Sequence, residues 1–264
     1  MGHHRPGAGP RGPLPDVRTA PVLTVLVCHD GAAWLPDVLA ALGALATRPR
    51  YVLAVDTGST DETPALLAAA LDGRLLDGVL TLPAGTGFGD AVRHAVERAE
   101  DRWGDPGSWV WLLHDDSAPA PDCLDVLLGA AGASPSVALL GPLCLDWDDP
   151  RLVVEAGLST DAAGHRQTGL GAAELDPGLL GGGLAQNTEV LAVGSAGALV
   201  RRDVWNALGG FDPAMPLLRD DLDLGWRANR ADHLVLVVPA ARIRHAAAGS
   251  RGERPVAALP PWLP

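Results

Sequence analysis

The chain has 264 residues, of which 47% are hydrophobic and 20% charged, a composition typical of a globular protein large enough to bury a core. Its formal net charge of −12 argues against nucleic acid or an anionic membrane surface as a general electrostatic partner. The 3 cysteines, Cys28, Cys123 and Cys144, are odd in number and lack CxxC spacing, so we expect reduced, buried thiols in a cytoplasmic protein.

The two ends of the chain differ in composition from its middle. Residues 1–20 lack the apolar stretch of a signal peptide and are predicted to be a flexible leader. Residues 251–264 are rich in proline and are predicted to be a tail, which could join a membrane segment in a longer protein. The apolar runs between them are too short to cross a bilayer. We therefore expect a single domain over residues 21–250, in the cytoplasm or at the inner face of the cell membrane.

Short apolar runs alternate with helical patterns through the first half. The runs predict strands, and the segments with apolar residues at helical spacing predict helices. The predicted strands are residues 21–30, 51–56, 78–83 and 108–116, and the predicted helices are residues 32–47, 58–71, 87–100 and 120–132. Strands that are apolar along their whole length are typical of a parallel sheet with helices on both faces. The first half therefore predicts an α/β fold.

Carboxylates follow three of these predicted strands. Asp30 follows the first, Asp56 the second, and Asp115 with Asp116 ends the fourth. One such acid often does no more than cap the following helix. In an open α/β sheet, however, ligands bind beyond the carboxyl ends of the strands. The convergence of acids from three strands predicts a binding site at that edge.

The second half has a less regular pattern. Residues 137–169 predict one core strand followed by shorter, hairpin-like pieces. Residues 170–188 are glycine-rich without periodicity, and we expect them to form a mobile loop near the site. Order returns at residues 190–200, which precede predicted helices at 201–209 and 219–231 and a last strand at 233–239.

The adjacent carboxylates of Asp115 and Asp116 repel each other and need a positive partner. Carboxylate oxygens are hard ligands, suited to Mg²⁺ or Mn²⁺ shared with the phosphates of a substrate. A solvated turn is the simpler interpretation of their spacing alone. The surrounding sequence decides between a metal site and a turn.

Four segments of the sequence resemble, in order, the signature blocks of family-2 glycosyltransferases. They are VLAVDTGSTDET (52–63), WLLHDDSAPAPDCL (111–124), LGGFDPAMPLLRDDLDLGWRANRA (208–231) and VVPAARIRHAAAGSRG (237–252). Each block alone is weak evidence, but the ordered set spans most of the chain. The resemblance is to the bacterial cell-wall or polysaccharide type of this family.

The resemblance implies a GT-A fold, which joins a Rossmann-like nucleotide-sugar-binding half, residues 21–145, to an acceptor and catalytic half, residues 146–250. It implies metal-dependent transfer of a sugar, with inversion at the anomeric carbon, from a nucleotide-diphosphate donor to a hydroxyl of a glycan or glycolipid. The implied cofactor is Mn²⁺ or Mg²⁺. A UDP-sugar is the first expectation for the donor, with dTDP- and GDP-sugars as alternatives. The glycine-rich segment 170–188 would then lie near the acceptor.

Carried over residue by residue, the resemblance implies roles at the site. Asp221 is expected to be the base, with Asp220 beside it. Asp116 and His245 are expected to hold the metal. The residues expected to meet the donor are Asp56 at its base or ribose, Asp115 at its ribose or sugar, and His29, Asp30, Gly58 and Arg93. Gly194, Ser195 and Trp226 are expected on the acceptor side.

The sequence departs from the family pattern at several positions. His114 stands at the first position of the commoner DDD triplet, and Asp220 replaces the glutamate of the usual Glu-Asp pair. Gly85 and Arg93 stand where the family has asparagine. Arg93 is therefore either a phosphate ligand or an ordinary exposed helix arginine.

Two other functions stay open at this point. A glycosyltransferase-like domain used only for binding would tolerate the loss of Asp116 or Asp221, and both are present. A sugar-nucleotide nucleotidyltransferase of similar fold would need a basic, glycine-rich loop after the first strand. The loop CHDGAAW (28–34) has no lysine or arginine, which argues against that activity.

Overall fold

The computed structural model describes residues 18–163, 165–168, 174–175, 186–215, 219–249 and 251–252. The predicted leader before residue 18, most of the predicted loop over 170–188 and the tail beyond residue 252 lie outside the described residues. None of the described helices is long and apolar enough to cross a membrane.

The first half alternates strands and helices, as predicted. Its elements are β1 (Arg18–Cys28), α1 (Leu35–Gly43), β2 (Thr47–Asp56), α2 (Thr63–Asp72), β3 (Gly78–Thr81), α3 (Phe88–Trp103), β4 (Trp109–His114), β5 (Ser117–Pro119) and α4 (Cys123–Ala131). β1 pairs in parallel with β2 and β4, and β2 pairs in parallel with β3. The register places Cys28 beside Asp56 and Val27 beside His114, so β1, β2 and β4 end at one edge of the sheet.

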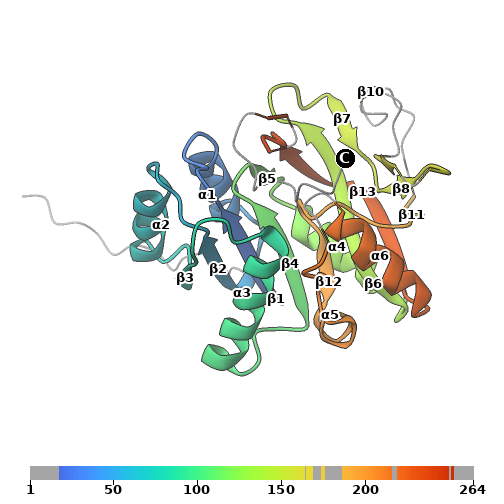
Figure 1. Ribbon diagram of the computed structural model, residues 1–264, viewed down its shortest axis with the longest axis horizontal. Helices are drawn as coiled ribbons and strands as arrows, with labels where there is room; N and C mark the ends of the chain where they lie inside the picture. The colour runs from blue at the N-terminus through green and yellow to red at the C-terminus, as the bar shows by residue number, and fades with distance from the viewer. Residues whose placement is uncertain are drawn as a thin grey trace, which may run out of the picture.

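The second half completes the same sheet with mixed pairing. Its elements are β6 (Val137–Asp146), β7 (Leu152–Glu155), β8 (Ser159–Thr160), β9 (Arg166–Gln167), β10 (Glu174–Leu175), β11 (Thr188–Glu189), β12 (Leu199–Arg201), α5 (Arg202–Leu208), α6 (Asp220–Arg230) and β13 (Leu234–His245). β12 lies antiparallel between β4 and β6, and β6 pairs in parallel with β13. The strand order β10-β7-β6-β12-β4-β1-β2-β3 shows that β12 joins the two halves (Figure 1).

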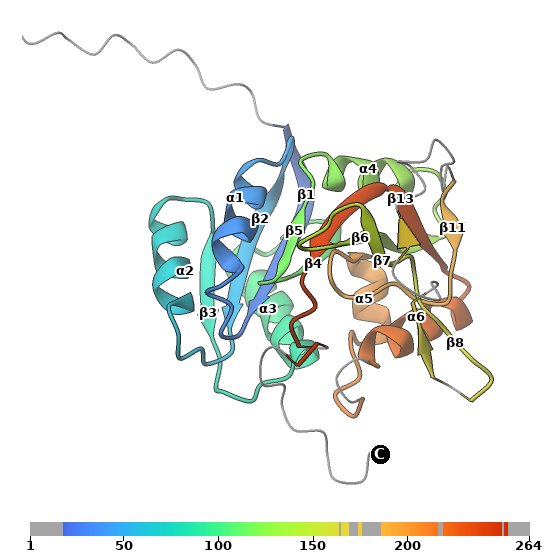
Figure 2. The same cartoon turned by 90° about the horizontal axis from the view of Figure 1, so that it is seen from above.

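Helices cover both faces of the sheet, and Figure 2 shows α4 and α6 on opposite sides of it. On one face, α1, α2 and α4 pack Leu35, Leu67 and Leu127 against the strands. On the other face, α3 and α6 contribute Val92 and Leu224. Burial of apolar surface on both faces explains why the central strands are apolar along their whole length.

Trp111 anchors the middle of the sheet. Its side chain is fully buried, and its indole N–H donates to the Gly197 carbonyl at 3.0 Å. An unpaired N–H in the core would cost about 1–3 kcal/mol, so this partner is needed. The bond also ties the segment before β12 to β4, which carries Gly194 and Ser195 to the end of that strand.

The second strand begins earlier than predicted. Helix α1 ends at Gly43 instead of continuing to residue 47, and β2 starts at Thr47, opposite Arg18. Pro49 lies in this early part of β2. Because β3 pairs only with the later residues of β2, Pro49 lies where β2 is an edge strand and a missing N–H is tolerated.

The last strand continues further than predicted. The sequence predicts its end at Pro239, but β13 runs on to His245. Its pairing with β6 shifts register between Val238 and Arg242, so a bulge absorbs the proline. The extension carries His245 opposite Ser117 of β5 and so to the acidic edge of the sheet.

Candidate active site

A cavity of about 660 Å³ opens at the carboxyl edge of the sheet. Its walls come from the loops after β1 and before α3, the end of β4, β7, β9, the start of α6 and the segment after β13. The predicted site residues that line it are His29, Asp115, Asp116, Gly194, Ser195, Asp220, Asp221 and His245. The cavity therefore brings together candidates for donor binding, metal binding and proton transfer.

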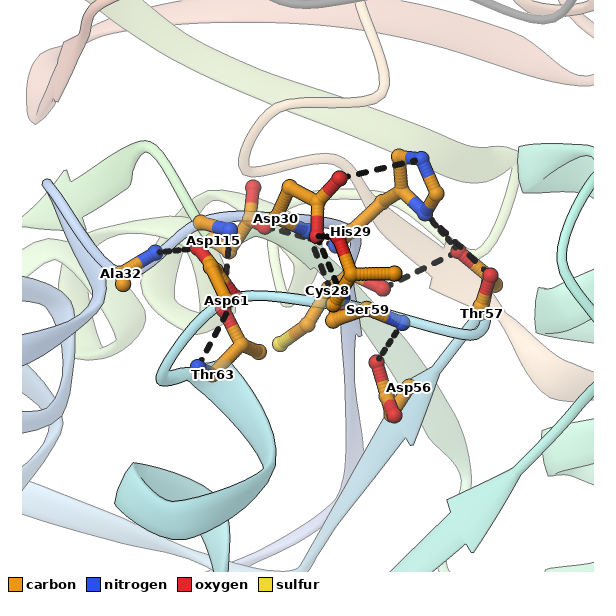
Figure 3. Close-up of polar contacts among 12 residues, drawn as sticks. Cys28, His29, Asp30, Ala32, Asp56, Thr57, Ser59, Asp61, Thr63 and Asp115 are labelled. Carbon is orange, nitrogen blue, oxygen red and sulfur yellow. Dashed lines mark hydrogen bonds and ion pairs between the residues drawn. The ribbon is translucent and has the colours of Figure 1, made fainter.

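The loop after β1 holds Asp115 (Figure 3). The His29 backbone N–H donates to Asp115 Oδ2 at 2.8 Å, and Asp115 is buried. A Cβ at Gly31 would overlap the Asp115 carboxylate, so the loop can approach this closely only with glycine there. The His29 ring lines the cavity, with Nδ1 3.2 Å from Thr57 Oγ1. The contacts fix the direction of Asp115 at the cavity wall.

Hydrogen bonds connect the loop after β1 to the loop after β2. The Asp30 amide donates to Ser59 Oγ at 2.9 Å (Figure 3). The Thr60 amide donates to Asp30 Oδ1 at 2.7 Å. Asp56 Oδ1 accepts from the Ser59 amide at 3.0 Å. Gly58 has a φ of 80°, a conformation that glycine adopts without strain. Asp30, Asp56 and Gly58, which were predicted to meet the donor, are not among the residues that line the cavity, and they hold these loops together.

Asp116 is fixed by the segment that follows β13. The Ala248 amide donates to Asp116 Oδ2 at 2.9 Å, and the Ala246 amide donates to the Asp116 carbonyl at 3.0 Å. The other carboxylate oxygen, Oδ1, lies 3.4 Å from His245 Nε2 and 3.9 Å from His114 Nδ1. The two adjacent acids at the end of β4 therefore point to different partners.

His114, Asp116 and His245 form a group that could hold a metal ion. Their candidate ligand atoms all lie within 4.8 Å of one another. Imidazole nitrogen with carboxylate oxygen is a donor set that suits divalent first-row metals. His114 Nε2 lies 3.0 Å from Ser195 Oγ, so the opposite ring nitrogen faces Asp116. The arrangement fits the metal expected from the sequence.

The role of His114 was missed by the sequence reasoning, which treated it only as a departure from the family triplet. A signal was present, however. The predicted strand 108–116 puts His114 and Asp116 two residues apart and so on one side, although β4 itself ends at His114 and Asp116 lies in the turn that follows. Ser195, expected beside the acceptor, lines the cavity and contacts His114.

A second group of charged side chains faces the cavity from the other half. Asp220 and Asp221 lie in the first turn of α6 and are buried. Arg166 Nη2 lies 3.3 Å from Asp221 Oδ2 and 2.9 Å from Glu155 Oε2. The Gly194 amide donates to Glu155 Oε1 at 3.0 Å, so the backbone at Gly194 helps to hold Glu155 in place. Acids in the first turn of a helix further benefit from its dipole.

Burial changes the ionisation of this second group. Burial raises the pKa of Asp220 to about 7, and the neighbouring Asp221 adds to the rise. Burial also raises the pKa of Asp221, although Arg166 opposes it. The pKa of Glu155 is raised by burial as well, against the effect of Arg166. A carboxyl group with a pKa near 7, as at Asp220, can take up and release protons near neutral pH.

Two predicted site residues lie away from the main cavity. Arg93 forms an ion pair with Asp90 and lines a separate hollow of about 160 Å³ beside Trp205. Trp226 is 52% exposed, and the guanidinium carbon of Arg230 lies 5.2 Å from the centre of its ring. These placements give Arg93 and Trp226 no contact with the metal group or the base candidate.

Glu155 and Arg166 were not predicted from the sequence. Glu155 ends a short strand, and Arg166 lies in a hairpin with no recognisable motif. Neither position carries a local pattern that distinguishes it from an ordinary surface residue. They meet Asp221 only through the folding of β7, β9 and α6 around the cavity.

Comparison with known proteins identifies the family. The chain matches the family described as Glycosyltransferase like family 2 over residues 20–256. It is 31% identical over 260 residues to the N-acetylglucosaminyl-diphospho-decaprenol L-rhamnosyltransferase of two Mycobacterium tuberculosis strains, CDC 1551 / Oshkosh and ATCC 25618 / H37Rv. The alignment covers 89% of this chain and 79% of each relative.

Solved glycosyltransferase structures share the fold. GalNAc-T7 with UDP, GalNAc and Mn²⁺ matches with a TM-score of 0.65 at 15% identity, over 88% of this chain and 44% of that chain. The mannosyltransferase PcManGT from Pyrobaculum calidifontis, in complex with GDP-Man and Mn²⁺, matches at 0.60 and 17% identity, over 88% and 59% of the two chains. S. aureus TarS 1–349 matches at 0.58 and 15% identity, over 88% and 62%. This chain thus spans less than two thirds of each of these solved chains.

These findings confirm the predicted GT-A fold and decide between the functions left open. At such low identity, the solved structures establish the fold alone. The family match and the curated relatives establish glycosyl transfer, so a domain used only for binding and a nucleotidyltransferase lose their support. The chain belongs to glycosyltransferase family 2 and is an inverting, nucleotide-sugar-dependent glycosyltransferase of the bacterial cell-wall type.

Proposed function

We propose that the chain transfers a sugar from a nucleotide-diphosphate donor to a hydroxyl group of a lipid-linked glycan, with Asp221 as the base. A divalent metal would be held by His114, Asp116 and His245. One observation carries this proposal: the metal-type group, at the ends of β4 and β13, and the buried Asp221, at the start of α6, face the same cavity.

The donor would lie along the carboxyl edge of β1 and β4. Asp115, whose Oδ2 accepts from the His29 amide and which lines the cavity, would meet a ribose or sugar hydroxyl of the donor. Phe88 packs against His114, with ring centroids 4.6 Å apart, and forms an apolar wall of the same cavity. An apolar wall with a few polar groups is typical of small-molecule sites.

The diphosphate would lie next to His114, Asp116 and His245. A bound Mn²⁺ or Mg²⁺ supplies stabilisation of the negative charge that develops on the departing diphosphate. Two imidazoles with one carboxylate suit Mn²⁺ better than Mg²⁺, which prefers oxygen ligands. The Mn²⁺ named with GalNAc-T7 and PcManGT is consistent with this assignment.

Asp221 would act on the acceptor. The acceptor oxygen forms a bond to the anomeric carbon while the bond from that carbon to the diphosphate oxygen breaks. The hydroxyl proton moves to the Asp221 carboxylate, and the electron pair of the broken bond stays on the diphosphate. Attack from the face opposite the leaving group inverts the anomeric carbon, which requires the base and the metal on different sides of the sugar.

The curated relatives favour a particular substrate class. Their name describes transfer of an L-rhamnosyl group to a lipid carrier, N-acetylglucosaminyl-diphospho-decaprenol. We infer that this chain uses a deoxysugar or related donor and an acceptor carried on a membrane lipid. Such an acceptor would place the enzyme at a membrane face while it works.

Calorimetric binding of UDP-, dTDP- and GDP-sugars, each with and without Mn²⁺, tests the proposal. We expect at least one nucleotide sugar to bind only with the metal and to raise the melting temperature, since a ligand of the folded state stabilises it. Asp116→Ala should lose this metal-dependent binding while it keeps the circular dichroism spectrum of the wild type. Equal donor affinity in Asp116→Ala and the wild type would exclude the assigned metal site.

A further inference from the structure

Arg166 connects carboxylates of two elements that are far apart in the sequence. Its Nη2 lies 2.9 Å from Glu155 Oε2 and 3.3 Å from Asp221 Oδ2. Glu155 ends β7, Arg166 begins β9, and Asp221 lies in the first turn of α6. One nitrogen thus fixes the base candidate against the opposite wall of the cavity.

The backbone fixes the far end of these contacts. Glu155 Oε1 accepts from the Gly194 amide at 3.0 Å. A Cβ at position 194 would overlap the Glu155 carboxylate, so glycine is needed for this approach. Glu155 therefore has one oxygen on the backbone and the other on Arg166, which restricts where the guanidinium can lie.

A short hairpin delivers Arg166 to the cavity. β8 and β9 pair antiparallel, with Thr160 opposite Arg166. The Ala156 amide donates to the Thr168 carbonyl at 3.1 Å, which ties the base of the hairpin to the end of β7. Arg166 is therefore positioned from both sides, by its own strand and by Glu155.

The acids around Asp221 make a counter-charge necessary. Asp220 lies next to Asp221 on α6, and its Oδ1 accepts from the Asp221 amide at 3.1 Å. Glu155 faces Asp221 from β7, and His245 is near enough from β13 to act on the charge of Glu155. Burial and neighbouring acids both favour the protonated form of a carboxyl group, and a cation opposes them. Within the described part of the chain, Arg166 is the cation in contact with Asp221.

We propose that Arg166 is a positioning residue for the transfer reaction: anchored by Glu155, its guanidinium aims the Asp221 carboxylate at the acceptor hydroxyl and supplies its counter-charge. The inference rests on the proposed role of Asp221 as the base. A base that is held protonated cannot accept a proton, so this contact sets the pH range in which Asp221 works.

Direct titration of Asp221 tests the proposal without a substrate. Metal-free protein with ¹³C-labelled aspartate carboxyl groups is titrated by NMR, and Asp221 is the resonance missing from Asp221→Asn. In Arg166→Met we expect its midpoint to rise by roughly 1–3 pH units, because burial then acts unopposed. Glu155→Gln keeps the shape but removes a neighbouring acid, so the midpoint should fall.

Matched variants separate charge from structure. Arg166→Lys keeps the positive charge and should restore most of the wild-type midpoint. Arg151→Met removes an arginine whose partner is Asp149, in the turn before β7, and should leave the midpoint unchanged. Coincident midpoints in the wild type, Arg166→Met and Glu155→Gln would show a merely structural ion pair and overturn the proposal. If Arg166→Met does not fold, Glu155→Gln and Arg166→Lys decide the question.

Failure of this inference is distinguishable from failure of the proposed function. If Asp221→Asn transfers sugar at nearly the wild-type rate, the base assignment is wrong whatever the titration shows. If Asp221→Asn is inactive but the midpoint of Asp221 does not respond to Arg166, the positioning role alone is wrong.

Discussion

The two halves of the cavity hold their acids in different ways. In the donor half, Asp30, Asp56 and Asp115 accept hydrogen bonds from backbone amides of neighbouring loops, at 2.7, 3.0 and 2.8 Å. In the half expected to bind the acceptor, Glu155 and Asp221 also accept from backbone amides, but both in addition meet a guanidinium, and burial raises the pKa of both.

This difference matches the work expected of each half. A backbone amide carries no titratable charge, so the hydrogen bond it offers to a carboxylate does not depend on the ionisation of a second side chain. That is what binding a donor and a metal requires. Side chains that share protons and charge can change state during the reaction, which is what proton transfer requires.

The largest expected effect comes from removing the base in the titratable half. Asp221→Asn keeps nearly the same shape but cannot accept a proton, so transfer should fall by about 10²–10⁴-fold. Donor and Mn²⁺ affinity, measured by calorimetry, should hardly change, because the donor half is untouched. Asp220→Asn should lower the rate less, since its expected duties are capping and positioning. A nearly normal rate in Asp221→Asn would move the base elsewhere, with Asp223 as the next candidate.

A large effect on stability is expected at Asp220, because the pKa of its carboxyl group differs between the folded and the unfolded chain. Its folded-state pKa of about 7 lies above the 3.8 expected without burial, so the folded state binds more protons between these values. The free energy of unfolding should therefore fall as the pH rises from about 4 to about 7, by about 1.4 kcal/mol per unit of pKa shift at most. Asp220→Asn should match the wild type near pH 4 and exceed it above pH 7 by about 3–4 kcal/mol.

Denaturant unfolding of both proteins in metal-free buffer at several pH values measures this difference. A stability difference that is the same at pH 4 and pH 8 would contradict the raised pKa of Asp220. The result would also weaken the contrast between the half whose carboxylates are held by backbone amides and the half whose carboxyl groups have raised pKa values.

An intermediate effect is expected at Ser195, which contacts a proposed metal ligand. Its Oγ lies 3.0 Å from His114 Nε2 and leaves Nδ1 facing Asp116. Ser195→Ala should lower Mn²⁺ affinity by about 10–100-fold, as removal of a ligand's supporting hydrogen bond commonly does. Electron paramagnetic resonance of free Mn²⁺ measures the change, and Ser159→Ala on the exposed β8 is the control. Unchanged affinity in Ser195→Ala would remove His114 from the metal group.

The smallest expected effect tests how tightly the donor half is built. A Cβ at Gly31 would overlap the Asp115 carboxylate, so Gly31→Ala should cost on the order of 1–2 kcal/mol of stability and weaken donor binding. Gly129 is exposed within α4 with no atoms near its missing Cβ. Gly129→Ala should therefore stabilise the protein by about 0.5–1 kcal/mol. If both substitutions have the same effect in thermal unfolding, the close contact between Gly31 and the Asp115 carboxylate does not restrict the loop after β1.

The local sequence determined much of the donor half. Continuous apolar runs predicted β1, β2 and β4, because a strand buried on both faces leaves no room for polar side chains. Asp115 and Asp116 could be assigned to the sheet edge, since parallel strands end together. The positions of the strand ends and the order of the family blocks could therefore be predicted from the sequence alone.

Only the tertiary structure decided which of the predicted residues meet. Trp226 lies in the same family block as Asp220 and Asp221, and Arg93 was also expected to meet the donor, yet Arg93 pairs with Asp90 and Trp226 is exposed. His114 and Asp116 became a metal-type group because β13 passes through a bulge and ends beside them. No local pattern encodes such a meeting of distant strands.

The acceptor half shows the same limit most clearly. Asp221 could be named from its block, but its partners Arg166 and Glu155 lie 55 and 66 residues earlier in segments without a motif. Hydrophobic periodicity and turn residues predict the local conformation of a segment, and they carry no information on which distant segments it will contact. Charges that are brought together by folding interact strongly because burial removes the water that would screen them. At this cavity, the burial exists only once the whole sheet has formed.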